Sequence, residues 1–121
     1  MCWVLYEILA EPEVVEFLYQ LDPAGRAAAD HRACLLAEQG PTLGEPYSRN
    51  LGDGVRELRF ALSTSQQARI TYWFPGGPLI IMLTAFIKQR QREMREVERA
   101  KLARKLCEAQ HDRTYEHIIT L

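Results

Sequence analysis

A long uncharged run over residues 70–87 limits the folds open to this chain more than any other feature. Its length approaches that of a membrane-spanning helix. The run is divided, however, by Pro75-Gly76-Gly77-Pro78, a sequence that stops a helix and favours a turn. Two strands over residues 68–74 and 79–87, joined by that turn, explain the run better than a transmembrane segment does.

The rest of the chain adds strands and helices to this hairpin. Residues 55–62 and 3–9 are rich in strand-forming side chains, which predicts two further strands. Helical spacing begins at Pro12, and Asp22-Pro23 marks the start of a second helix that ends at Gly40. The order β-α-α-β-β-β-α predicts an α+β fold, with an antiparallel sheet of about four strands, an N-terminal helical hairpin and a C-terminal helix.

Three further segments complete the predicted organisation. Turn-forming residues are concentrated in residues 40–54, which predicts a surface loop, and the charged residues 91–110 predict the last helix. Residues 112–121 are predicted to be a loose tail. The predicted apolar faces comprise Ala24, Ala27, Ala28, His31, Cys34 and Leu35 in the second helix, and Met94, Val97, Ala100, Ala103, Leu106 and Cys107 in the last.

Length and composition indicate one domain over residues 1–121, because 121 residues with 47% hydrophobic content bury a single core. The three cysteines are widely spaced and form no CxxC pair, so neither structural disulfides nor a zinc site is predicted. His31 and Cys34, and likewise Cys107 and His111, share helical faces but lack carboxylate support for a metal. We therefore expect no cofactor, and the absence of signal-peptide features predicts a cytoplasmic protein that binds no membrane.

Charge is distributed unevenly along the chain. The formal net charge of −1 combines −6 in residues 1–57 with +5 in the remainder. No acidic residue occurs between Glu57 and Glu93, whereas five basic residues lie there in or just after predicted strands, namely Arg59, Arg69, Lys88, Arg90 and Arg92. Adjacent strands would gather these cations on a face without carboxylates, which suits the phosphate backbone of a nucleic acid.

Four stretches together carry a resemblance to a known family. They are Leu51-Gly-Asp-Gly-Val-Arg-Glu-Leu-Arg59, Arg69-Ile-Thr-Tyr72, Ala85-Phe86-Ile-Lys88 and Glu96-Val-Glu-Arg-Ala100. In this order and spacing they resemble the phage-derived, HigB-like branch of the RelE/ParE toxin superfamily. The resemblance implies a RelE/ParE-like fold and a toxin of a type II toxin–antitoxin pair, whose antitoxin is commonly a helix-turn-helix protein. The HigB and RelE branches cleave messenger RNA on the ribosome, whereas the ParE branch inhibits DNA gyrase.

Cleaving RNA without a metal requires a base for the 2′-hydroxyl, charge stabilisation of the pentavalent phosphate and a proton for the departing 5′-oxygen. Arg59 and Arg69 are predicted to hold the phosphate, because arginine releases its proton too reluctantly to act as a base. Lys88, surrounded by like charges, is the candidate base. The predicted catalytic residues are Arg59, Arg69, Lys88 and Arg90, and the predicted RNA-binding residues are Arg56, Tyr72 and Arg92.

Some alternatives stay open at this point. The proton donor is either Arg90 or the phenol of Tyr72, and the arginines also fit an ordinary solvated strand surface. Tyr72 and Trp73 point to opposite faces of a strand, so one is predicted in the core and the other exposed, where it would stack on a base. The predicted function is a ribosome-dependent mRNA endoribonuclease that inhibits translation. A gyrase inhibitor of the ParE kind and a prophage-derived nucleic-acid-binding module without catalysis are the alternatives.

Overall fold

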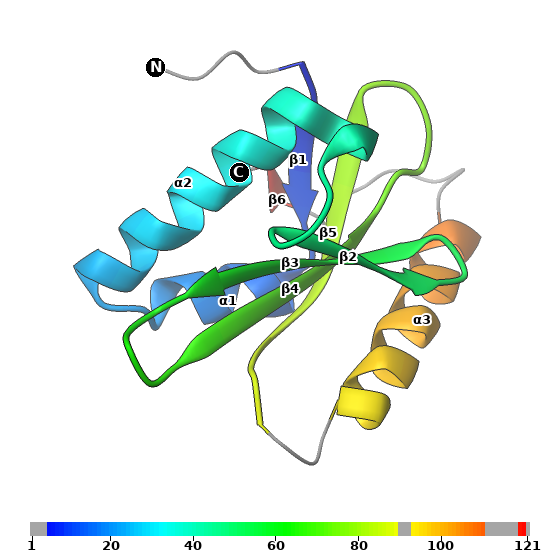
Figure 1. Cartoon of the computed structure of the whole chain (residues 1–121). Helices are drawn as coiled ribbons and strands as arrows, with labels where there is room; N and C mark the ends of the chain where they lie inside the picture. The colour runs from blue at the N-terminus through cyan, green and yellow to red at the C-terminus, as the bar shows by residue number, and fades with distance from the viewer. Residues whose placement is uncertain (1–4, 90–92, 111–118, 121) are drawn as a thin grey trace.

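A computed structural model describes residues 5–89, 93–110 and 119–120 as an α+β domain (Figure 1). Its strands are β1 (Glu7–Ala10), β2 (Ser48–Gly52), β3 (Val55–Ala61), β4 (Gln67–Trp73), β5 (Leu79–Ile87) and the two-residue β6 (Ile119–Thr120). Its helices are α1 (Pro12–Tyr19), α2 (Pro23–Gln39) and α3 (Glu93–Ala109), with a short 3-10 helix η1 (Gly40–Thr42) after α2. The predicted α+β class is confirmed. None of the described helices is long and apolar enough to cross a membrane.

All six strands join one sheet in the order β2-β3-β4-β5-β1-β6. Strands β2 to β5 are antiparallel neighbours, but β1 runs parallel to β5, with Glu7 opposite Leu79. The sheet is therefore mixed, not purely antiparallel. The reason lies in the connection, because the helical hairpin and three strands intervene in sequence between β1 and β5 and return the chain in the same direction.

Two strands were not predicted. Strand β2 lies inside the predicted loop of residues 40–54 and pairs with β3, and a tight turn with Asp53 in the left-handed region (φ 55°) joins the two strands. At the other end, Ile119 and Thr120 pair with β1, so the prediction of a loose tail is wrong for these two residues. Residues 111–118 lie outside the described part of the chain.

Both faces of the sheet are covered by helices. Helices α1 and α2 pack on one face, over a core that includes Leu58, Ile70 and Met82, and α3 packs on the other (Figure 1). Tyr72, on the α2 side, is 0% exposed, and Trp73, on the α3 side, is 7% exposed. The prediction that one of these two aromatic side chains would be exposed is therefore wrong, because α3 covers the second face.

The boundaries of α2 follow from the sequence, but its orientation does not. The Asp22 carboxylate accepts a hydrogen bond from the Gly25 amide at 2.7 Å and caps the first turn. Gly40 ends the helix at φ 54°, where any side chain would collide with the ring of Tyr6. The buried residues of α2 are Gly25, Ala29, Leu36 and Ala37, which do not form the predicted face.

Helix α3 also differs from the predicted pattern. Ala100 and Cys107 are buried against the sheet as predicted. Met94 and Leu106, which were predicted in the same apolar stripe, are 80% and 58% exposed. The helix therefore touches the sheet along a narrower line than its apolar residues indicate.

Candidate functional site

A buried carboxylate lies at the centre of the basic residues on the α3 side of the sheet. Glu57 in β3 is 1% exposed, and its Oε1 atom lies 3.4 Å from the Nε atoms of both Arg59 and Arg69. Among the described residues neither carboxylate oxygen of Glu57 accepts a hydrogen bond. The expectation of a carboxylate-free face is therefore wrong, since the two arginines share one negative charge.

Strand register explains how these side chains meet. Glu57 and Arg59 are two residues apart on β3 and so point to the same face. Arg69 on β4 is directly opposite Arg59, and Arg49 on β2 is directly opposite Glu57. Paired residues in adjacent strands are neighbours on one face. Sequence reasoning missed Arg49 because it lies in the predicted loop, but the spacing of Glu57 and Arg59 was an available signal.

Arg59 and Arg69 differ in their access to solvent. The Arg59 side chain is 23% exposed, whereas that of Arg69 is only 5% exposed. The NH1 group of Arg69 donates a hydrogen bond to the Ala68 carbonyl at 3.0 Å. Burial, and next the proximity of Arg59, lower the pKa of Arg69 from its ordinary value. Arg69 therefore lies beneath the surface, and Arg59 is the member of the pair that an incoming anion reaches.

Lys88 adds a fourth cation to this face. It is exposed, and its backbone N–H donates to the Gln67 carbonyl at 2.8 Å, which continues the pairing of β5 with β4. Alternation along the strand places its side chain on the side that carries Arg69. The predicted site residues Arg90 and Arg92 lie outside the described residues.

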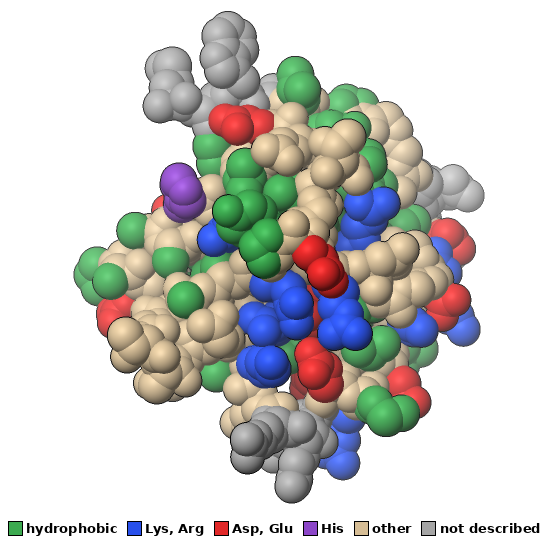
Figure 2. Space-filling view, viewed as in Figure 1, with side chains coloured by type: hydrophobic (Ala, Val, Ile, Leu, Met, Phe, Trp, Pro, Cys, Tyr) green, Lys and Arg blue, Asp and Glu red, His purple; other side chains and the backbone are tan. Residues whose placement is uncertain are grey.

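We call Arg49, Arg59, Arg69 and Lys88, together with Glu57, the basic cluster. Figure 2 shows Lys and Arg side chains gathered in front of strands β3 and β4, beside α3, with acidic side chains among them. With its four cations and one carboxylate, the cluster keeps an excess of positive charge. Such a local excess attracts a polyanion even though the chain as a whole carries a formal net charge of −1.

The start of α3 adjoins the basic cluster. Its first described residue, Glu93, acts electrostatically on both Glu57 and Arg69. Arg99 in the same helix donates hydrogen bonds to Glu13 of α1 at 2.6 and 2.7 Å, which ties α3 to the body of the domain. Between α3 and β2 lies a groove of about 440 Å³, and its lining residues are Arg49, Asn50, Leu51, Glu93, Met94, Val97, Glu98 and Lys101.

Comparison with known protein families assigns the chain to one of them. The model of the family described as phage derived protein Gp49-like (DUF891) matches residues 16–112, a stretch that contains the whole basic cluster. The chain belongs to this family. Gp49-like proteins are related to RelE/ParE-type toxins. Searches of curated proteins and of solved structures give no significant match to the chain.

Two of the predicted site residues of this Gp49-like chain lie on the opposite side of the sheet. Arg56 donates a hydrogen bond to the Pro41 carbonyl at 2.8 Å, and its guanidinium lies 5.4 Å from the centre of the Phe74 ring. Tyr72 is fully buried, its hydroxyl is hydrogen-bonded to Ser48, and burial raises its pKa. Neither joins Arg59 and Arg69, contrary to the prediction, because odd and even positions of a strand face opposite ways.

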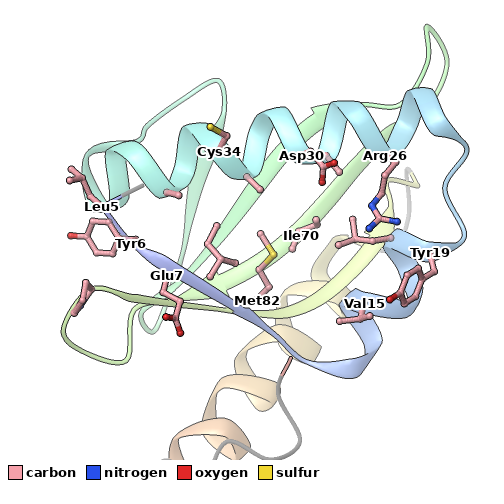
Figure 3. Close-up of a pocket in the computed structure, with 16 residues that line it drawn as sticks. Leu5, Tyr6, Glu7, Val15, Tyr19, Arg26, Asp30, Cys34, Ile70 and Met82 are labelled. Carbon is pink, nitrogen blue, oxygen red and sulfur yellow. The ribbon is translucent and has the colours of Figure 1, made fainter. Parts of the chain in front are cut away.

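A larger hollow, of about 770 Å³, lies between α2 and β1 on the other side of the sheet (Figure 3). Ile70 and Met82 line it, and the guanidinium of Arg26 lies 5.5 Å from the centre of the Tyr19 ring at one end. None of the predicted site residues lines this largely apolar hollow. Because a phosphate backbone needs several cations, we assign the candidate site to the basic cluster and the groove beside it.

The histidine and cysteine side chains of the Gp49-like chain are the possible metal ligands. Within the described residues no group of three or more His, Cys, Asp and Glu side chains is placed to hold a metal ion. Cys34 is disulfide-bonded, contrary to the expectation of no disulfide, so its thiolate is not available to pair with His31. Burial raises the pKa of the Cys107 thiol to about 11. His111 lies outside the described residues.

Proposed function

We propose that this Gp49-like chain is the toxin of a type II toxin–antitoxin pair, of the HigB-like kind, which cleaves messenger RNA on the ribosome without a metal. The observation that carries the proposal is the basic cluster, where pairing between β2, β3, β4 and the end of β5 gathers four cations on one face of the sheet. The relation of the family to RelE/ParE-type toxins supports it. A cognate helix-turn-helix antitoxin would inhibit the toxin, and both would act in the cytoplasm, where ribosomes translate.

The positions of the cations indicate how the reaction would proceed. The RNA 2′-hydroxyl gives up its proton to solvent water as its oxygen attacks the adjacent phosphorus and the bond from phosphorus to the 5′-oxygen breaks. The departing 5′-oxygen takes a proton from solvent water, which leaves a 2′,3′-cyclic phosphate and a 5′-hydroxyl. The partly exposed Arg59 and the exposed Arg49 and Lys88 are available to contact the phosphate and stabilise its added negative charge. Arg69 supports Arg59 from beneath, because its own side chain is almost fully buried.

The groove between β2 and α3 offers a place for a nucleotide next to that phosphate. Arg49 and Glu93 belong both to the lining of this groove and to the surroundings of Glu57. Met94, which is highly exposed, offers an apolar side chain against which a base would pack. We therefore place the base on one side of the scissile phosphate in this groove.

Toeprinting on translating ribosomes tests the proposed function. We expect the purified chain to produce cuts in the messenger at fixed positions relative to the codon in the ribosomal A site. Pulse labelling after expression without antitoxin should show protein synthesis falling before DNA synthesis. Inhibition of purified gyrase, with uncut messenger, would instead favour a gyrase poison. RNA binding without cuts or growth arrest would indicate a module without catalysis.

The role of Lys88 is tested by replacing it with arginine and with glutamine. Lys88 is exposed, so water and salt screen it from the neighbouring guanidinium groups, and we expect it to neutralise phosphate. Lys88→Arg, which keeps the charge, should cleave within about threefold of the wild-type rate, whereas Lys88→Gln should lose roughly tenfold or more. Single-turnover cleavage measured across a pH series gives both rates. A nearly inactive Lys88→Arg variant would show that Lys88 is the general base instead.

A further inference from the structure

The carboxylate of Glu57 is unexpected in a site that would bind a polyanion, because it repels negative charge. It cancels part of the positive charge of the basic cluster, and burying a charge is costly in itself. The charged groups that act on it come from every strand and helix around it. They are Arg59 on its own strand, Arg69 on β4, Arg49 on β2 and Glu93 on α3. A residue that weakens attraction for RNA and is costly to bury calls for a specific role.

The contacts of Glu57 define what it does to the two arginines. Arg59 and Arg69 are directly opposite each other on adjacent strands, where like charges repel. The Nε atom of each lies 3.4 Å from the same carboxylate oxygen, which makes an ion pair without a hydrogen bond. A guanidinium held at Nε has its two terminal nitrogens directed elsewhere, and Arg69 uses one of them on the Ala68 carbonyl. Glu57 therefore holds both guanidinium groups side by side.

We propose that Glu57 is a positioning residue that orients Arg59 and Arg69 for the scissile phosphate from beneath them, at the cost of weaker attraction for the RNA backbone. This inference rests on the proposed nuclease function. Glu57 does not touch the substrate, because it is fully buried below Arg59. Guanidinium groups that are already oriented before the RNA binds raise the rate of the chemical step, since the enzyme does not have to reorganise its charges during the reaction.

Protonation of Glu57 gives the inference a distinctive signature. Burial raises the pKa of Glu57 above its ordinary value, against the opposing effects of Arg69 and Arg59. The folded protein therefore binds this proton more tightly than the unfolded chain does. The contribution of Glu57 to stability falls as the pH rises from the pKa of Glu57 in the unfolded chain to its higher pKa in the folded protein. The orientation of the arginines needs the ionised form and should improve over the same range. A purely structural residue would not link stability and activity to pH in opposite directions.

The decisive variant is Glu57→Gln, which keeps the size of the side chain but removes its charge. We expect the single-turnover cleavage rate to fall roughly 10-fold to 100-fold, as misplaced catalytic groups cause. The concentration of ribosome–messenger complex that gives half the maximal rate should stay unchanged or fall, because one negative charge has left the site. In the wild-type protein the cleavage rate should fall at low pH as Glu57 becomes protonated, and in Glu57→Gln this fall should disappear. Glu57→Asp, which keeps the charge, should restore part of the rate. Glu16→Gln, which removes an exposed charge from α1, serves as the matched control.

A second measurement does not depend on cleavage. In the wild-type protein, the ¹⁵N resonances of the Arg59 and Arg69 Nε–H groups should move together on acidification with one midpoint, and Glu57→Gln should abolish that titration. The proposal is overturned if these resonances ignore both pH and the substitution, or if Glu57→Gln cleaves at the wild-type rate. If wild-type protein cuts no messenger while the resonances titrate as expected, the contact stands and the proposed nuclease function fails.

Discussion

Replacing Arg59 by alanine is expected to slow messenger cleavage by roughly 100-fold to 1,000-fold, because it removes the one member of the arginine pair that reaches solvent. That loss corresponds to about 3–4 kcal/mol of transition-state stabilisation. The fold should survive, since the buried Glu57 keeps its ion pair with Arg69 when Arg59 is removed. Single-turnover cleavage on pre-assembled ribosome complexes and denaturant unfolding measure the two effects. A variant that cleaves within a few fold of wild type would remove Arg59 from the site.

Arg56 provides a matched control on the same strand. It is three residues from Arg59, but it packs on the Phe74 ring and the Pro41 carbonyl on the α2 side. Arg56→Ala should leave cleavage unchanged and lower stability by about 1 kcal/mol, the value typical of a lost cation–π contact. If Arg56→Ala and Arg59→Ala lose equal activity, loss of overall positive charge explains both effects better than a local site does.

Replacing Arg69 by methionine should lower the stability of the domain as well as its activity. The sequence predicts that Arg69 holds a phosphate on a face without carboxylates. The structure instead gives a side chain that is 5% exposed, paired with the fully buried Glu57. Removing one partner of a buried ion pair costs about 3 kcal/mol, because the remaining charge stays buried with less compensation. In a domain of this size the melting temperature should fall on the order of 10 °C.

The double variant Glu57→Leu with Arg69→Met tests the cause of that loss. Replacing both partners of a buried pair by apolar groups of similar size is often neutral for stability. We therefore expect the double variant to unfold at a higher denaturant concentration than either single variant, although its cleavage should remain low. A double variant whose loss equals the sum of the two single losses would show that packing, and not an unbalanced charge, determines the stability at this site.

Much of the fold follows from local sequence signals. The Pro75-Gly76-Gly77-Pro78 turn predicts the β4–β5 hairpin, and β5 has the predicted bounds. Asp22-Pro23 and Gly40 likewise predict the bounds of α2, because capping and helix termination are properties of a few adjacent residues. Strand β2 escapes such signals, since the residues Ser48–Gly52 neither alternate in polarity nor favour strands, and pairing with β3 alone makes them a strand.

The arrangement of the candidate site follows from the sequence only in part. Residue type and position in or just after predicted strands point to Arg59, Arg69 and Lys88, and strand pairing with alternation puts all three on one side of the sheet. The same alternation places Arg56 and Tyr72 on the opposite side, but the sequence does not show which side carries the site. The sequence also does not show which of these side chains are buried, because the coverage of both faces of the sheet depends on where α3 packs.

By itself the sequence determined the α+β class, the positions of most helices and strands, and the cationic character of the strands after residue 57, because these depend on residue type and short-range spacing. Only the tertiary structure decided that β1 runs parallel to β5, that Glu57 lies between Arg59 and Arg69, and that Arg69 lies beneath Arg59. Those features depend on which distant segments pair and which face α3 covers, and local residue patterns carry no information about either.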